Sequence, residues 1–200
     1  LSLHDALPIW FVALPIGVIF FVLSQPIIRI MFERGAFTPQ ATKITADMLA
    51  FFTFGIPAMA AWQIAARAFY SLQDTITPLK VGFIQIAIDI VFLLTLPRIM
   101  GYRGLPLATA ISMSIGFLLL WALLCAKLPE LKEVNLLSTF SRAVAMCLLE
   151  GVFIYIASNF VWTRQKLNFA KDITFTVIIG GIGLVLYFFA GYLLRYPEIE

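Results

Sequence analysis

Six apolar runs, each about as long as a bilayer core is thick, restrict what this chain can fold into. A helix that spans a membrane needs about 20 apolar residues. Because lipid offers the backbone no hydrogen bonds, such runs must be helical. The predicted runs are 10–32, 46–68, 80–100, 104–126, 140–162 and 173–194. Their short connections predict an all-α polytopic membrane bundle of six transmembrane helices, with neighbouring helices antiparallel.

The composition indicates that lipid surrounds most of the chain. Hydrophobic residues make up 62% and charged residues 12%, with a mean hydropathy of +0.97, whereas soluble domains are about 25% charged. Lys and Arg lie singly between the runs, as at membrane flanks, which argues against a nucleic-acid partner. No phosphate loop, nucleophile motif or set of metal-binding His occurs, so no enzyme is expected. Cys125 and Cys147 are expected to pack as small apolar side chains.

Pro and Thr residues mark helix starts and bends. Thr38-Pro39 and Thr77-Pro78 are each expected to place a hydroxyl at the N-cap and a Pro at the first helical position. Pro15, Pro26 and Pro57 lie well inside apolar runs. Each of these predicts a bend, because proline removes a helical hydrogen bond.

Asp89 is the clearest ionisable residue inside a predicted span, and such residues usually have a partner or a task. Gln85 lies one turn before it on the same face. In the next run, Pro106 frees a carbonyl and Thr109 adds a hydroxyl. If the two helices pack together, these oxygens would suit Na⁺, or a proton held on Asp89. The alternative is a protonated Asp89 that hydrogen-bonds Gln85 and joins the helices.

The fourth and fifth runs carry small residues and one acid. Ala108, Ser112 and Gly116 recur at intervals of four residues and predict close helix packing. Glu150 lies in the middle of its run and is a candidate intramembrane polar site. Either it faces a polar interior or it is protonated against another helix, and the sequence leaves both open.

Two segments carry a family resemblance: RIMFERGAFTPQAT (29–42) and ARAFYSLQDTITPLKVG (66–82), the latter followed by GLPLATAIS. Together they resemble the later half of the MurJ/MviN family, bacterial lipid II flippases of the MATE-like (MOP) exporter superfamily. The resemblance is close over about 10–127. Beyond that it rests on the number and spacing of the helices.

The resemblance implies the last six helices of a fourteen-helix, multi-pass protein of the bacterial inner membrane. Residues 10–127 would be four helices of the C-terminal lobe, 128–142 a connector at the membrane surface, and 143–200 two extra helices and a tail. The whole protein would move lipid II, the peptidoglycan precursor, by alternating access with a missing N-terminal lobe. The two extra helices would form a groove for the polyprenyl tail, in contact with membrane lipid.

In some family members a Na⁺ site lies in this lobe, and the resemblance maps it onto the polar residues above. Asp89 matches an Asp, Thr109 matches a Thr, the carbonyl ligand falls near Leu105, and Gln85 replaces an Asn. A further acid on the seventh helix is not in this chain, so the site would be incomplete. Na⁺ is therefore the candidate coupling ion, and no other cofactor is expected.

Residues 1–9, LSLHDALPI, have no expected counterpart in the family. They can be encoded by a common short-read sequencing adapter in a frame that agrees with Trp10. We therefore expect a translated adapter joined to a truncated gene, in which case His4 and Asp5 form no site. The alternative is a genuine loop between the eighth and ninth helices.

Two other functions remain open from the sequence. One is a different exporter of the superfamily that moves O-antigen lipid or drugs. The other is a six-helix membrane scaffold that transports nothing.

Overall fold

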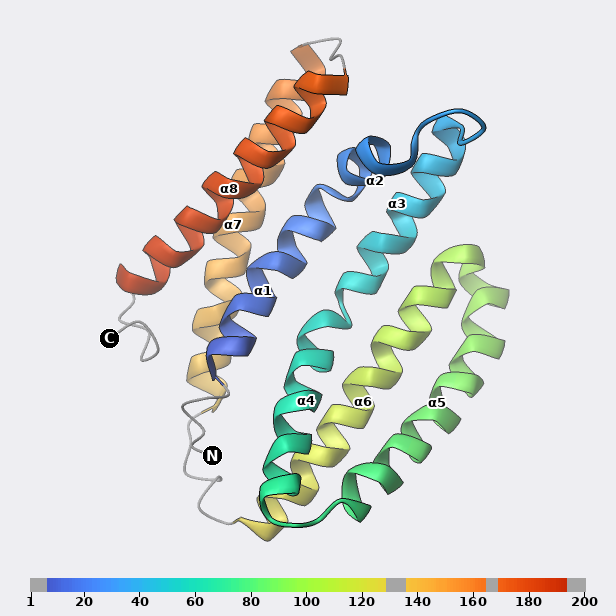
Figure 1. Ribbon diagram of the computed structural model, residues 1–200, viewed down its shortest axis with the longest axis vertical. Coiled ribbons are helices and arrows are strands. Elements are labelled where there is room, and N and C mark those ends of the chain that lie inside the picture. Colours follow the sequence, from blue (N-terminus) through green and yellow to red (C-terminus); the bar gives the residue numbers. More distant parts are fainter. Residues whose placement is uncertain (1–6, 129–135, 165–168, 194–200) are drawn as a thin grey trace. The chain divides into compact units, whose positions relative to one another are not determined.

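The computed structural model describes residues 7–128, 136–164 and 169–193 of the 200-residue chain, and the regular elements there are all helical (Figure 1). They are α1 (Leu7–Val22), α2 (Ser24–Phe32), α3 (Pro39–Thr53), α4 (Ile56–Ser71), α5 (Ile76–Met100), the 3-10 helix η2 (Gly101–Arg103), α6 (Gly104–Lys127), α7 (Leu136–Arg164) and α8 (Phe169–Leu193). The predicted all-α fold is confirmed. Each predicted run falls on one helix or on a consecutive pair.

The chain divides into two compact units. One combines Leu1–Ala13 with Phe51–Ser138 and contains α4, α5 and α6, so we call it the α4–α6 unit. The other combines Leu14–Ala50 with Thr139–Glu200. It contains most of α1 and of α3 together with α2, α7 and α8, and we call it the α7–α8 unit.

In the α4–α6 unit, α5 and α6 form an antiparallel hairpin that turns at η2 (Figure 1). Gly104 lets the two helices meet at this turn, because a Cβ there would lie 2.6 Å from the backbone of Leu96. α4 packs closely on α6 at Gly55, where a Cβ would lie 3.1 Å from Ala110 Cα. The buried core of the unit is Ala65, Ala66, Phe69, Val81, Leu120 and Leu124.

Two of the predicted spans are broken helices, and each break lies four residues before a proline. α1 ends at Val22, because Pro26 has no N–H to donate to the Val22 carbonyl. α2 then continues at 75° to α1. In the same way, α3 ends at Thr53, four residues before Pro57. Pro15 lies inside α1 without ending it, so proline position alone does not decide where a helix stops.

The predicted helix starts differ in outcome. α3 begins at Pro39, and the Ala41 N–H donates a hydrogen bond to the Thr38 hydroxyl at 3.3 Å. This cap is confirmed. α5, however, begins two residues before Pro78. The predicted cap by Thr77 is therefore wrong, and the reason lies in the turn before α5.

By length and composition, the described residues hold three stretches able to cross a membrane: Ile76–Lys127, Arg142–Val161 and Lys171–Tyr192. The number rises to five if α1 with α2, and α3 with α4, each form one span. The count of six therefore stays a prediction. Many large apolar side chains point outward, including Ile99 at 82% and Val185 at 68% exposed, which suits a lipid environment.

Three sequence predictions meet the limits of the described residues. His4 and Asp5 lie outside them, as do residues 129–135 of the predicted surface connector. α7 begins at Leu136, inside the remainder of that connector. Cys125 and Cys147 are both half-buried and form no disulfide, as expected for packing residues.

Candidate functional site

The helix pair α5–α6 brings the predicted polar residues onto one shared face. Gln85 and Asp89 lie one turn apart on α5, and Ser112 and Gly116 lie one turn apart on α6. Because the two helices are antiparallel, Asp89 meets Ser112 and Gln85 meets Gly116. The side-by-side packing on which the predicted site depends is therefore present.

Asp89 accepts a hydrogen bond from Ser112, whose Oγ lies 2.8 Å from Asp89 Oδ1. The same hydroxyl lies 3.0 Å from the carbonyl oxygen of Thr109, so its single O–H serves two acceptors. Ser112 is fully buried and Asp89 is half-buried. The hydrogen bond of Asp89 therefore joins it to the neighbouring helix, rather than to Gln85 on its own helix.

Gly116 makes room for the Gln85 side chain. A Cβ at Gly116 would lie 2.9 Å from both Cγ and Oε1 of Gln85, closer than real contacts allow. The stripe of Ala108, Ser112 and Gly116 is buried, as predicted for packing. Ser112 also donates a hydrogen bond to Asp89, and sequence reasoning missed it as a site residue. The available signal was its position three residues after Thr109.

The other two predicted ligands lie nearby on α6. Thr109 is half-buried and takes part through its carbonyl, while the Leu105 side chain is 41% exposed one turn earlier. Within 76–127, the Thr109 hydroxyl donates no hydrogen bond to Asp89. The described residues contain no cluster of three or more His, Cys, Asp or Glu. The candidate ligand atoms are therefore all oxygens, and one of the groups is a carboxylate. Such a set suits a hard cation more than a transition metal.

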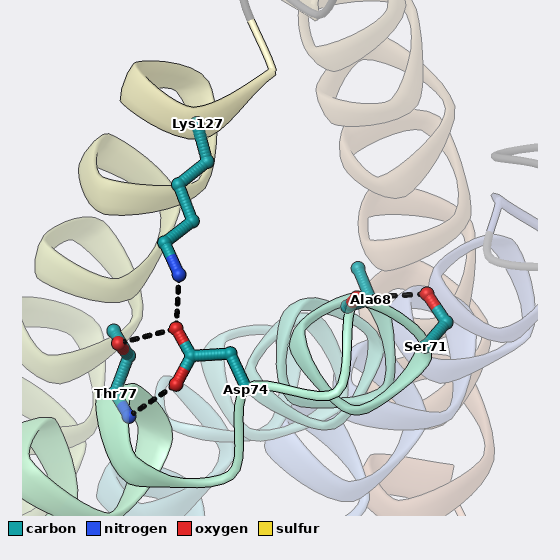
Figure 2. Close-up of polar contacts among 5 residues, drawn as sticks. All are labelled: Ala68, Ser71, Asp74, Thr77 and Lys127. Atoms are coloured by element: carbon teal, nitrogen blue, oxygen red, sulfur yellow. Dashed lines mark hydrogen bonds and ion pairs between the residues drawn. The ribbon is translucent and has the colours of Figure 1, made fainter.

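Asp74 organises the turn between α4 and α5 (Figure 2). Its carboxylate accepts hydrogen bonds from the Thr77 N–H at 3.0 Å and from the Thr77 hydroxyl at 2.6 Å, and it pairs with Lys127 at the end of α6. The contact with Lys127, followed by those with Thr77, holds the Asp74 pKa well below its ordinary value. Asp74 thus caps α5 in place of Thr77, and this explains the FYSLQDTITP segment.

A second polar cluster explains the RIMFERGAFTPQAT segment. Arg29 of α2 lies 3.5 Å from the carboxylate of Asp172 on α8 and 3.8 Å from that of Glu33. Glu33 accepts a hydrogen bond from the Thr42 hydroxyl at 2.8 Å. Asp172 and Thr42 are each 2% exposed. One arginine therefore links α2 to α8. No sequence pattern points to Asp172 as its partner, because Asp172 lies far along the chain.

Glu150 lies in α7 and is 0% exposed. Neither carboxylate oxygen has a hydrogen-bond partner among residues 7–128, 136–164 and 169–193. One of the two interpretations of Glu150 from the sequence was that it faces a polar interior. Among the described residues, no hydrogen-bonding group surrounds its carboxylate in that way.

The comparisons with known proteins agree with one another. A family model described as "Lipid II flippase MurJ" matches residues 3–176. A probable lipid II flippase MurJ of Rhizobium meliloti (strain 1021) is 28% identical over 164 residues, which cover 82% of this chain and 30% of that protein. The lipid II flippase MurJ of Thermosipho africanus (strain TCF52B) is 35% identical over 171 residues, which cover 76% of this chain and 35% of that protein.

A solved structure is also similar. It is a lipid II flippase MurJ in the inward closed conformation, with a TM-score of 0.74 and 26% identity over 96% of this chain and 38% of that chain. The chain thus spans about a third of the length of the relatives it matches. The family match begins at residue 3, inside the segment predicted to have no counterpart.

Proposed function

The chain belongs to the lipid II flippase MurJ family, and on this premise we propose that it is the C-terminal part of a flippase that carries lipid II across a bacterial inner membrane. The observation that carries the proposal is the family match over residues 3–176. The TM-score of 0.74 over 96% of the chain supports it. The family is one of lipid flippases, so the chain belongs with transporters and not with enzymes.

We infer six membrane spans, which correspond to the last six of a fourteen-helix flippase. The stretch Ile76–Lys127 holds two antiparallel helices of 25 and 24 residues. Each is about 36–38 Å long at 1.5 Å per residue, enough to cross the bilayer alone. If α5 and α6 are counted as separate spans, the largest possible number of candidate membrane spans rises from five to six. The missing N-terminal lobe would supply the other side of the transport cavity.

In this proposal α7 and α8 hold the polyprenyl tail of lipid II during alternating access. Both helices carry large apolar side chains that point outward. Leu148 and Ile156 of α7 are 64% and 62% exposed, and Val177 and Val185 of α8 are 67% and 68% exposed. An apolar surface of this kind suits a lipid tail or membrane lipid.

Na⁺ is the proposed coupling ion, with Asp89, Gln85, Thr109 and the Leu105 carbonyl as ligands. The hydrogen bond between Ser112 and Asp89 supports the proposal, because it orients the carboxylate between α5 and α6. Ser112 joins the donor set as a further oxygen. A ligand from the missing lobe would complete the coordination.

The Na⁺ proposal is tested in a complete flippase that carries this chain as its C-terminal part. Na⁺ should raise the unfolding temperature above that in choline chloride at equal ionic strength. Asp89→Asn should abolish this shift, because it removes the charged ligand. Asp74→Asn removes a carboxylate from the helix turn, and it should keep the shift. An unchanged shift in Asp89→Asn would leave Asp89 with a helix-joining role only.

The flippase proposal is tested by rescue of a bacterial strain depleted of its own lipid II flippase. The complete protein should restore growth and cell shape. If it is made and inserted but rescues only an O-antigen or drug export defect, the other exporter class is correct. If it rescues none of these defects, a non-transporting scaffold is the better assignment. The adapter origin of residues 1–9 is tested by sequencing source DNA across the Trp10 codon.

A further inference from the structure

Glu150 is a buried titratable group that the proposed flippase activity does not use. It lies within the candidate span Arg142–Val161, about 12 Å along the helix from Arg142 at 1.5 Å per residue. Its side chain is 0% exposed, and both carboxylate oxygens lack a hydrogen-bond partner among the described residues. Such a group at mid-membrane needs a partner or a bound ligand.

The surroundings of Glu150 are apolar and closely packed. On α8, a Cβ at Gly183 would lie 3.6 Å from Glu150 Cγ and 2.7 Å from Ile154 Cδ1. On the α1 side, a Cβ at Gly151 would lie 3.3 Å from Val18 Cγ1. Two glycines therefore allow α8 and α1 to pack closely around this part of α7, where Glu150 is fully buried.

Few titratable groups face this position. On α7 itself, Cys147 lies nearly one turn before Glu150, and on α8 the buried Tyr187 follows Gly183 by one turn. The stretch Val12–Val22 of α1 contains no titratable residue. In the part of the chain that the structure describes, no Lys or Arg forms an ion pair with Glu150.

An ionised carboxylate in these surroundings would be an uncompensated charge in a low-dielectric interior. The neutral acid avoids that cost. We propose that Glu150 is a proton-binding site inside the membrane, occupied while α7 packs against α8 at Gly183 and emptied when that contact opens to water. The proposal goes beyond lipid II transport and does not depend on it.

The proton exchange is simple to balance. When the contact opens, the O–H bond of the Glu150 acid breaks, its electron pair stays on the carboxylate, and the proton passes to water. When α8 closes again, the carboxylate must take a proton back before it is buried. Closure of α8 onto α7 is therefore linked to the uptake of one proton. A higher pH favours the open arrangement.

The test is infrared spectroscopy of the full chain in lipid nanodiscs, with glutamate labelled with ¹³C in the carboxyl group. At neutral pH the wild-type chain should show the C=O stretch of one protonated, weakly hydrogen-bonded glutamic acid. Glu150→Gln keeps the size and neutrality of the acid and should lose this band. Glu33→Gln is the matched control, because Glu33 pairs with Arg29, and it should keep the band.

Substitutions at two glycines of α8 test whether the packing of α8 controls the protonation of Glu150. Gly183→Ala should push α8 away from Ile154, admit water, and lose the band at a pH at which the wild type retains it. Gly181→Ala is the control, because a Cβ there meets nothing within 4 Å. It should leave the band unchanged.

Three results would overturn the proposal. The first is a wild-type chain with no protonated-glutamate band, which would mean an ionised Glu150 paired with a cation. The second is a band that survives in Glu150→Gln. The third is a band with the same pH response in Gly183→Ala as in the wild type, which would show that α8 packing does not control the proton. Because Glu150→Gln mimics the neutral acid, helical content by circular dichroism should stay at the wild-type level.

Discussion

Asp89 and Glu150 are both acids in the middle of apolar helices, yet the two units surround them differently. Asp89 is half-buried and accepts a hydrogen bond from Ser112 on the next helix. Glu150 is fully buried against Gly183 and has no donor among the described residues. Hydrogen-bond donors stabilise a carboxylate, whereas an apolar contact favours the neutral acid. Burial alone therefore does not decide what polar partners an acid in a helix has, because the neighbouring helix must supply them.

We expect the largest loss of stability from filling the space that Gly116 leaves for the Gln85 side chain in the α4–α6 unit. Gly116→Ala would place a Cβ 2.9 Å from Gln85 Cγ and Oε1. Overpacking of this kind costs about 1–3 kcal/mol of stability. Thermal unfolding in detergent micelles measures the loss.

Gly82→Ala on α5 is the matched control for Gly116→Ala. A Cβ at Gly82 meets nothing within 4 Å, and alanine is the better helix former, so stability should hold or rise. Combining Gly116→Ala with Gln85→Ala should recover most of the loss. A double variant as unstable as Gly116→Ala would show that Gln85 is not what the new methyl group meets.

The next effect concerns the charge pair of the α7–α8 unit. Arg29→Gln leaves the Asp172 carboxylate, only 3% exposed, without its arginine. Breaking a buried pair costs about 3–5 kcal/mol, but Arg29 is 46% exposed and water screens it. We therefore expect a loss of about 1–2 kcal/mol in thermal unfolding.

Arg98→Gln, at an exposed position near the end of α5, is the control and should change stability little. Adding Asp172→Asn to Arg29→Gln should recover part of the loss, because a buried charge disappears. If Arg29→Gln and Arg98→Gln behave alike, the contact between α2 and α8 contributes nothing measurable.

A smaller effect tests the partner of Asp89. Ser112→Ala removes the hydroxyl that donates to Asp89 across the helix pair. Hydrogen bonds between membrane helices contribute about 0.6–1 kcal/mol, so a loss of that size is expected. Ser114→Ala is the control, because its hydroxyl donates within its own helix to the Ala110 carbonyl at 2.8 Å. Equal losses would contradict a special role for Ser112.

The smallest effect is the acid response of the turn before α5. The pKa of Asp74 is lowered from its ordinary value of 3.8, first by Lys127 and then by Thr77. A carboxyl with a depressed pKa stabilises the fold fully above its ordinary value, and the stabilisation is lost as the pH falls through the lowered pKa. Unfolding temperatures from about pH 5 down to about pH 2 should therefore fall in the wild type and fall less in Asp74→Asn. Equal slopes would show that Asp74 does not contribute.

Much of the fold could be predicted from the sequence because it depends on local chemistry. The lengths of the apolar runs predicted where helices lie, and Thr38-Pro39 predicted the start of α3. Pro26 and Pro57 predicted bends, and α1 and α3 end four residues before them, although Pro15 lies inside α1 without ending it. The Thr77 cap failed because the Asp74 carboxylate accepts hydrogen bonds from both the N–H and the hydroxyl of Thr77, so that the helix begins before Thr77. Asp74 also reaches Lys127, which is distant in the chain.

The candidate site was predictable only in part, because part of it depends on contacts between residues that are distant in the chain. Gln85 and Asp89 share a face of α5 whatever the helix packs against, since helical spacing alone sets that relation. Which residue Asp89 meets depends on how α5 and α6 are rotated about their axes. Helices that are apolar on nearly all sides carry no polar face to set that rotation. Inter-helix contacts therefore decided that Asp89 meets Ser112, while Glu150 packs against Gly183 and has no hydrogen-bond partner among the described residues.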